Sequence, residues 1–98
     1  MKKIIIYYLL KNKEKAESLF FNLISYAQKD NVSIRIYKSA QGHRAIFENG
    51  NSVEMRRASE NIRGLMWSTA YIDSELDLET IQTTILPAGK GSKDSRYF

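Results

Sequence analysis

Arginine side chains gather around one polar stretch of this 98-residue chain. Arg56 and Arg57 stand where the stretch begins and Arg63 lies within it, in the segment RASENIRG. Guanidinium groups carry forked donors that suit the oxygens of carboxylates and phosphates. The spacing therefore predicts an anion-binding loop, and a solvated loop rim is the alternative. His43 and Lys38, which flank predicted strands, are further candidates for the same site.

Aromatic and acidic residues follow the arginines. Trp67 and Tyr71 lie four residues apart, so a β-strand would place both on one face. Such a pair packs in a core, stacks on nucleic-acid bases or anchors a protein interface. The same predicted strand ends at Asp73, where a nucleoside triphosphatase would hold magnesium. A lone carboxylate binds that ion weakly, and His43 is the sole histidine, so we predict no metal site.

The first part of the chain predicts a strand, a helix and a second strand. Ile4 to Leu10 is apolar, β-branched and aromatic, as in a buried strand. Asn12 offers a helix N-cap, and Val32 to Tyr37 alternates as a half-buried strand would, completing a parallel crossover unit. The helix between them has one apolar stripe, formed by Ala16, Leu19, Phe20, Leu23, Ile24 and Ala27.

Asn49 and Gly50 predict a β-hairpin, because both residues tolerate the positive φ of a type I′ turn. A two-residue loop at this point pairs Ile46 with Val53. On that register Ile46 and Val53 share the core face with Met55 and Arg44.

The last part of the chain predicts one more strand and one more helix. The strand runs from Trp67 to Asp73. Ser74 and Asp77 have the spacing of a capping box, and a helix from there would end before Pro87. Glu75, Asp77 and Glu79 suit such a helix start. The expectation is a single α/β (or α+β) domain over residues 1–87, with a flexible basic tail over 88–98.

The fold expected from this order is a mixed five-stranded sheet with two helices, connected as strand, helix, strand, hairpin, strand and helix. The net charge of +4 comes from the two ends of the sequence, which favours solubility over a basic nucleic-acid face. The chain has no cysteine, and its longest apolar run, from Ile4 to Leu10, falls well short of the roughly 20 residues of a membrane span. We expect a cytosolic protein with no membrane partner.

The stretch from Phe47 to Asp73 resembles the ATPase core of phage large terminases, the motors that package DNA into capsids. FENGNSVEM and then ENIRGLMWSTAYID follow the order of that core: a strand, an Asn-Gly turn, a second strand, an Arg-Gly loop and a strand ending in an acidic residue. The resemblance implies an ATPase-like core with Asp73 in the place of the magnesium-binding aspartate.

The departures from the terminase pattern concern the chemistry. The phosphate-binding loop of that family is G-x-x-x-x-G-K-[ST], whereas YYLLKNKEKAES, between the first strand and the first helix, contains no glycine. Ser74 stands where the family has its catalytic glutamate, and Glu75 comes one residue too late. We therefore expect no ATP hydrolysis, no catalytic residue and no cofactor.

Three functions stay open on these grounds. The first is a non-catalytic interaction module of phage or prophage type, which binds a phage or host protein or a second copy of itself through Trp67, Tyr71 and Met66 with Arg63 at the rim. The second is a nucleic-acid, nucleotide or phosphate binder that uses the arginines and the basic tail. The third is an enzyme with a site at His43 and the arginine loop.

Overall fold

The computed structural model describes residues 3–28, 33–40, 42–57, 68–77 and 94–98. One α-helix, one short 3-10 helix and six strands occur in these ranges. In chain order they are β1 (Lys3–Tyr8), η1 (Leu10–Asn12), α1 (Lys13–Gln28), β2 (Ile34–Tyr37), β3 (Arg44–Phe47), β4 (Ser52–Arg57), β5 (Thr69–Ile72) and β6 (Asp94–Tyr97). The domain is thus α/β, as the alternation of sequence patterns predicted.

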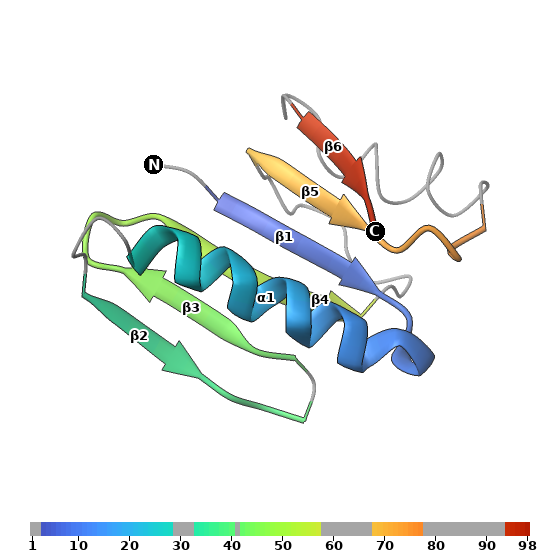
Figure 1. The fold of residues 1–98 in the computed structure, drawn as a ribbon, viewed down its shortest axis with the longest axis horizontal. Coiled ribbons are helices and arrows are strands. Elements are labelled where there is room, and N and C mark those ends of the chain that lie inside the picture. The colour runs from blue at the N-terminus through green and yellow to red at the C-terminus, as the bar shows by residue number, and fades with distance from the viewer. Residues whose placement is uncertain (1–2, 29–32, 41, 58–67, 78–93) are drawn as a thin grey trace.

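All six strands join one mixed sheet in the order β2-β3-β4-β1-β5-β6 (Figure 1). The strands β4, β1, β5 and β6 are parallel, and β2 and β3 add an antiparallel pair at one side. The predicted crossover from β1 through α1 to β2 exists, but β3 and β4 lie between its two strands. The first strand therefore occupies the middle of the sheet.

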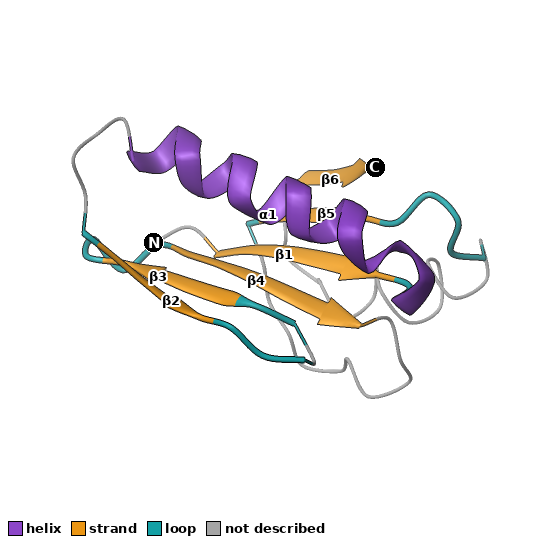
Figure 2. Cartoon of the chain, turned by 60° about the horizontal axis from the view of Figure 1, so that its bottom comes forward, coloured by secondary structure: helices purple, strands orange, loops and turns teal. Residues whose placement is uncertain are grey.

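The helix α1 covers one face of the sheet (Figure 2), and its apolar stripe explains this placement. Ala16, Phe20 and Ile24 are buried against the sheet, while Leu19 and Leu23 are half-buried beside them. This confirms the expected apolar stripe from Ala16 to Ile24, and the side chain of Ala27, its last expected member, lies outside the described part of the structure. On the sheet side the buried set consists of Ile6, Tyr8, Ala45, Phe47, Val53 and Met55.

The hairpin between β3 and β4 exists, but the expected register is wrong by one residue. Ala45 pairs with Val53 and Ile46 with Ser52, so the loop has three residues rather than two. Gly50 has a φ of 90° and donates its N–H to the carbonyl of Phe47 at 2.9 Å, the arrangement of a three-residue hairpin loop.

The one-residue difference reverses the two faces of β3 relative to β4. Phe47 faces α1 and is 7% exposed, whereas Ile46 is 37% exposed on the opposite face. Arg44 also lies on that opposite face, across from Glu54. The core therefore takes Ala45 and Phe47 in place of Ile46 and Arg44.

The sheet has one strand more than expected, because Asp94–Tyr97 forms β6. This corrects the prediction of a flexible tail for that part of residues 88–98. The strand pairs in parallel with β5, Phe98 donates its N–H to the carbonyl of Ile72 at 3.0 Å, and Arg96 lies 6.0 Å from the centre of the Tyr71 ring. Backbone pairing with β5 holds this segment, a property that its Gly- and Lys-rich composition does not reveal.

Most of the second predicted helix lies outside the described residues. Ser74 to Asp77, where it was expected to begin, form a turn in which Leu76 donates its N–H to the carbonyl of Asp73 at 3.0 Å. No helix among the described residues has the length and apolarity needed to cross a bilayer.

Candidate functional sites

Two places in the fold bring polar side chains together, and the first is the carboxyl end of the parallel strands. In the strand order of the sheet, β4, β3 and β2 lie on one side of β1, and β5 and β6 lie on the other side. The order therefore reverses direction between β1 and β5. Ligands of parallel α/β sheets bind at such a reversal, outside the carboxyl ends of the two strands. The turn after β1 contains Asn12, and Asp73 directly follows β5.

Three hydrogen bonds occupy the carboxylate of Asp73, which is 2% exposed. Its Oδ2 accepts the backbone N–H of Leu9 at 3.0 Å and the side-chain Nδ2 of Asn12 at 2.9 Å. Its Oδ1 accepts the backbone N–H of Glu75 at 2.9 Å. Asp73 therefore ties the turn after β1 to the turn after β5.

The electrostatics favour the ionised form of Asp73. Burial raises the pKa of this carboxyl, but the hydrogen bonds from Asn12, Glu75 and Leu9, with the positive charge of Lys15, lower it further than burial raises it. The net pKa of Asp73 lies below its ordinary value. A charged carboxylate held by three donors of the protein itself is a structural link between the two turns.

Asn12 directly precedes α1, but it is itself helical in η1, and its side chain forms no described hydrogen bond with a backbone N–H of α1. Its Nδ2 instead bridges Asp73 and Oε2 of Glu75. Lys11 Nζ lies 3.7 Å from the same Glu75 oxygen, on the exposed side of the group. The described residues contain no set of three His, Cys, Asp or Glu side chains that would hold a metal ion.

The second place is the face of β2, β3 and β4 that points away from α1. Alternation along the strands and their registers place seven side chains on this open face. They are Arg35 and Tyr37 from β2, Arg44 and Ile46 from β3, and Ser52, Glu54 and Arg56 from β4.

Contacts within this open face order its side chains. The guanidinium of Arg44 lies 5.0 Å from the centre of the Tyr37 ring, within the range of a cation–π contact. Arg56 Nε lies 2.8 Å from Glu54 Oε1, and Glu54 is the more buried of the two. Arg35 forms no ion pair with any described residue. Arg44 thus stacks on Tyr37, Arg56 pairs with Glu54, and Arg35 has no ion-pair partner among the described residues.

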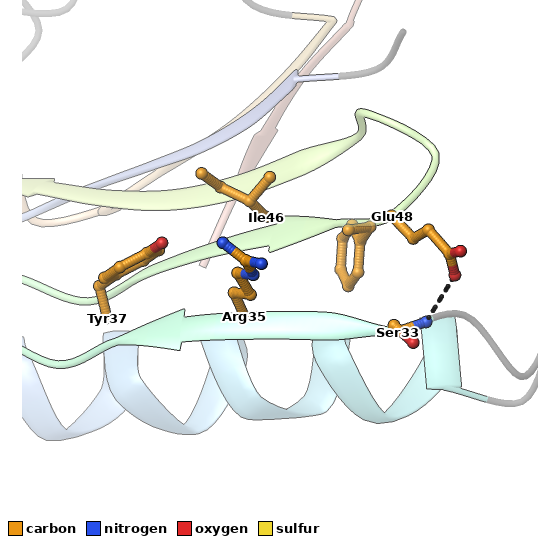
Figure 3. A pocket seen from close by; sticks show the side chains of 6 residues that line it. Ser33, Arg35, Tyr37, Ile46 and Glu48 are labelled. Atoms are coloured by element: carbon orange, nitrogen blue, oxygen red, sulfur yellow. Dashed lines mark hydrogen bonds between the residues drawn. The ribbon is translucent and has the colours of Figure 1, made fainter.

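Two hollows mark the open face. The first, of about 410 Å³, is lined by Arg35, Tyr37, Ile46 and Glu48 among others. In Figure 3 Arg35 and Tyr37 rise from β2 on the side away from α1, and Glu48 accepts the backbone N–H of Ser33 at 3.4 Å. The second hollow, of about 330 Å³, continues past Tyr37 toward Gly42 and Arg56. Both are open depressions of mixed polarity.

The structure separates the residues that the sequence grouped as an arginine site. Arg56 and Arg57 are neighbours in β4 and so point to opposite faces, Arg56 beside Tyr7 and Arg57 beside Tyr8 on the α1 side. Arg63, Trp67 and Met66 lie outside the described residues. Tyr71 is half-buried on the α1 side of β5, away from the open face.

His43 lies on the α1 side of the sheet, away from the open face and apart from Arg56. Its ring lies 5.7 Å from that of Phe20 and 5.8 Å from that of Phe21, and its side chain is 12% exposed. Nδ1 accepts the N–H of Ser39 at 3.3 Å, and Nε2 lies 3.7 Å from Glu17 Oε1. His43, a candidate member of the anion site, is thus packed against the rings of Phe20 and Phe21.

Sequence reasoning missed Arg35, Tyr37 and Arg44 as members of a site. The signal was present in the alternation from Val32 to Tyr37, which sets Arg35 and Tyr37 on the polar side. Arg44 joins them only on the observed hairpin register, because the expected one placed it toward the core.

Comparison with known proteins found no relative of this chain. No protein-family model, no curated protein and no solved structure matches this chain.

Proposed function

We propose that this protein is a small non-catalytic binding domain that recognises a protein partner through the open face of β2, β3 and β4. The observation that carries the proposal is the grouping of Tyr37, Ile46 and three arginines on a sheet surface that no described element covers. Tyrosine and arginine are enriched among the residues that dominate binding at protein interfaces.

The arrangement around Asp73 supports a function without catalysis. Its carboxylate is buried and accepts bonds from Leu9, Asn12 and Glu75, so the place of a magnesium ligand is filled by contacts within the chain. The turn after β1 also lacks the glycines that let a backbone wrap around phosphates. The resemblance of residues 47–73 to terminase cores supports a phage or prophage setting.

Binding of nucleic acid is the second candidate. Arg35, Arg44 and Arg56 share one face with Tyr37, as in surfaces that hold phosphates and stack a base. Two observations weigh against it: Arg56 is paired with Glu54, and Tyr37 is the sole described aromatic ring on that face.

Site-specific photo-crosslinking tests the proposal. A photoreactive residue replaces Ile46 on the open face, and in a control variant it replaces Tyr26, which is 75% exposed on α1. In cells that express the protein, we expect an adduct of one defined added mass from position 46 and not from position 26. Loss of the adduct on protease treatment supports a protein partner, whereas loss on nuclease treatment would favour the second candidate. Equal adducts from both positions would contradict the proposal.

A further inference from the structure

The strand β2 ends the sheet on the side away from β1, and its outer edge is unpaired among the described residues. Arg35 stands opposite Ile46 and Tyr37 opposite Arg44. Glu48 donates its N–H to the carbonyl of Ser33 at 2.8 Å, so residues 33, 35 and 37 direct their backbone groups toward β3. The N–H and C=O groups of Ile34 and Ile36 therefore point outward.

Among the described residues, no proline, bulge or covering element protects this edge. Proline, a bulge or a covering element commonly blocks an edge strand. The strand has the sequence IRIY, and its last three residues are exposed. Ile36 is 39% and Tyr37 is 45% exposed. Arg35 is the one charged residue within β2. The outward N–H and C=O groups are thus accessible to another backbone.

The charges around β2 indicate which side chains an added strand should have. Around the outer hairpin, β2 and β3 with their flanking residues present Arg35, Lys38 and Arg44, all exposed, and a single carboxylate, Glu48. Glu48 is already directed at the N–H of Ser33. The unpaired guanidinium of Arg35 lies on the open face, while Ile34 and Ile36 lie on the α1 face. An added strand therefore meets Arg35 on the open face and Ile34 and Ile36 on the α1 face, where Lys38 lies over the ring of Phe21.

We infer that β2 accepts an extended segment of an acidic partner protein as a seventh strand, in which carboxylate residues alternate with apolar ones. The carboxylates face Arg35, and the apolar side chains extend the row of Ile34 and Ile36. Main-chain hydrogen bonds supply affinity and the alternating side chains supply specificity in this mode of binding. The inference rests on the proposed protein-binding function and adds the mode of binding and the chemistry of the partner.

Other occupants fit the edge less well. A second copy of the chain that pairs β2 with β2 through Ile34 and Ile36 would place Arg35 opposite its own copy, and like charges across a strand pair destabilise it. A nucleic acid has no alternating N–H and C=O groups for the outward groups of Ile34 and Ile36. Both occupants are distinguished by the test below.

The test uses a nine-residue peptide in which glutamate alternates with valine, and a matched peptide in which lysine replaces glutamate. Solvent exchange of backbone amides is followed by NMR on the full chain. At a peptide concentration ten times Kd, exchange at Ile34 and Ile36 should slow about tenfold. The amide of Arg35, already directed at β3, is the internal reference. The lysine peptide should give no slowing.

Two variants separate edge pairing from other contacts. Ile36→Pro removes an outward N–H and leaves the bonds between β2 and β3 in place, since proline is tolerated at an edge position that faces solvent. It should abolish the slowing at Ile34, while Ile36→Val keeps it. Arg35→Glu should reverse the preference between the two peptides.

Several results would overturn the inference. The first three are no slowing with the glutamate peptide, equal slowing with both peptides, and slowing that persists in Ile36→Pro. Slowing that depends on protein concentration without peptide would indicate a second copy as the occupant. Slowing by an oligonucleotide would indicate a nucleic acid. If the peptides fail while the crosslink from position 46 persists, strand addition is wrong and the proposed protein-binding face stands. If that crosslink also fails, the proposed function is wrong as well.

Discussion

Asp73 Oδ2 and Asn12 Nδ2 lie 2.9 Å apart and join two turns that are far separated in the chain. The same Oδ2 also accepts the N–H of Leu9 at 3.0 Å. A buried carboxylate with these donors needs each of them, because a charge that loses its partners in a protein interior is strongly destabilising. The link therefore holds together the carboxyl ends of the neighbouring strands β1 and β5.

Removing either partner of this link should lower the free energy of unfolding. Asp73→Asn places an amide where Leu9, Asn12 and Glu75 all donate, and should cost about 2–3 kcal/mol. Asn12→Ala leaves two backbone donors and should cost about 1–2 kcal/mol. Urea denaturation measures both. Lys11→Ala is the control on the exposed side of the group and should change the value by less than about 0.5 kcal/mol.

The ionisation of Asp73 should make stability depend on acid pH. The pKa of its carboxyl is lowered in the folded protein relative to an ordinary value of 3.8, so the folded state binds its proton less readily than the unfolded chain. The resulting stability is present above pH 3.8 and is lost as the pH falls through the folded-state pKa. Urea midpoints between pH 6 and pH 2 should fall less steeply for Asp73→Asn than for the wild type.

The Asn12→Ala variant provides the matched comparison for this acid dependence. It removes the hydrogen bond that contributes most to lowering the pKa of Asp73, so the difference between the folded-state and unfolded-state pKa narrows and less stability should be lost on acidification than in the wild type. Identical acid profiles in all three proteins would show that Asp73 does not contribute.

Gly42 should be intolerant of any side chain. Its φ is 129°, and a Cβ at this position would lie 2.7 Å from the backbone oxygen of Met55. Gly42→Ala should therefore cost about 2–4 kcal/mol, from backbone strain together with the steric contact. Gly50→Ala, at a φ of 90°, isolates the cost of conformation and should lose only about 1–2 kcal/mol. Thermal and urea unfolding measure both, and equal losses would argue against the close approach at Met55.

The observed hairpin register predicts opposite sensitivities for two adjacent residues. Phe47→Ala should cost about 3–5 kcal/mol because its ring is buried under α1, whereas Ile46→Ala should cost less than about 1 kcal/mol. The two-residue loop expected from the sequence predicts the reverse order. Urea denaturation of the two variants therefore decides between the registers. If both variants are destabilised, the larger loss in free energy of unfolding identifies the buried residue.

The elements defined by local patterns could be predicted from the sequence. The stripe through Ala16, Phe20 and Ile24 fixed α1, and alternation fixed the two faces of β2. The hairpin could be located, but its register could not, because Gly50 supplies positive φ equally well to a loop of two residues or of three. That choice decided whether Ile46 or Phe47 is buried.

Features that depend on distant pairing could not be predicted. β6 is a strand because β5 pairs with it, and its own composition is typical of a tail. Asp73 was singled out by its position at a strand end, but its role depends on Asn12, which was interpreted as a helix cap. The open face follows from the order of β2, β3 and β4, which fixes which polar side chains become neighbours.

The central position of β1 has a consequence for synthesis on the ribosome. This apolar strand is made before every other element, yet its two neighbours end at Arg57 and Ile72. At about 5–20 residues per second, its second neighbour follows only after several seconds. Until then Ile4, Ile5 and Ile6 lack at least one of their two strand partners. Folding of the complete sheet must therefore wait until β5 has been made.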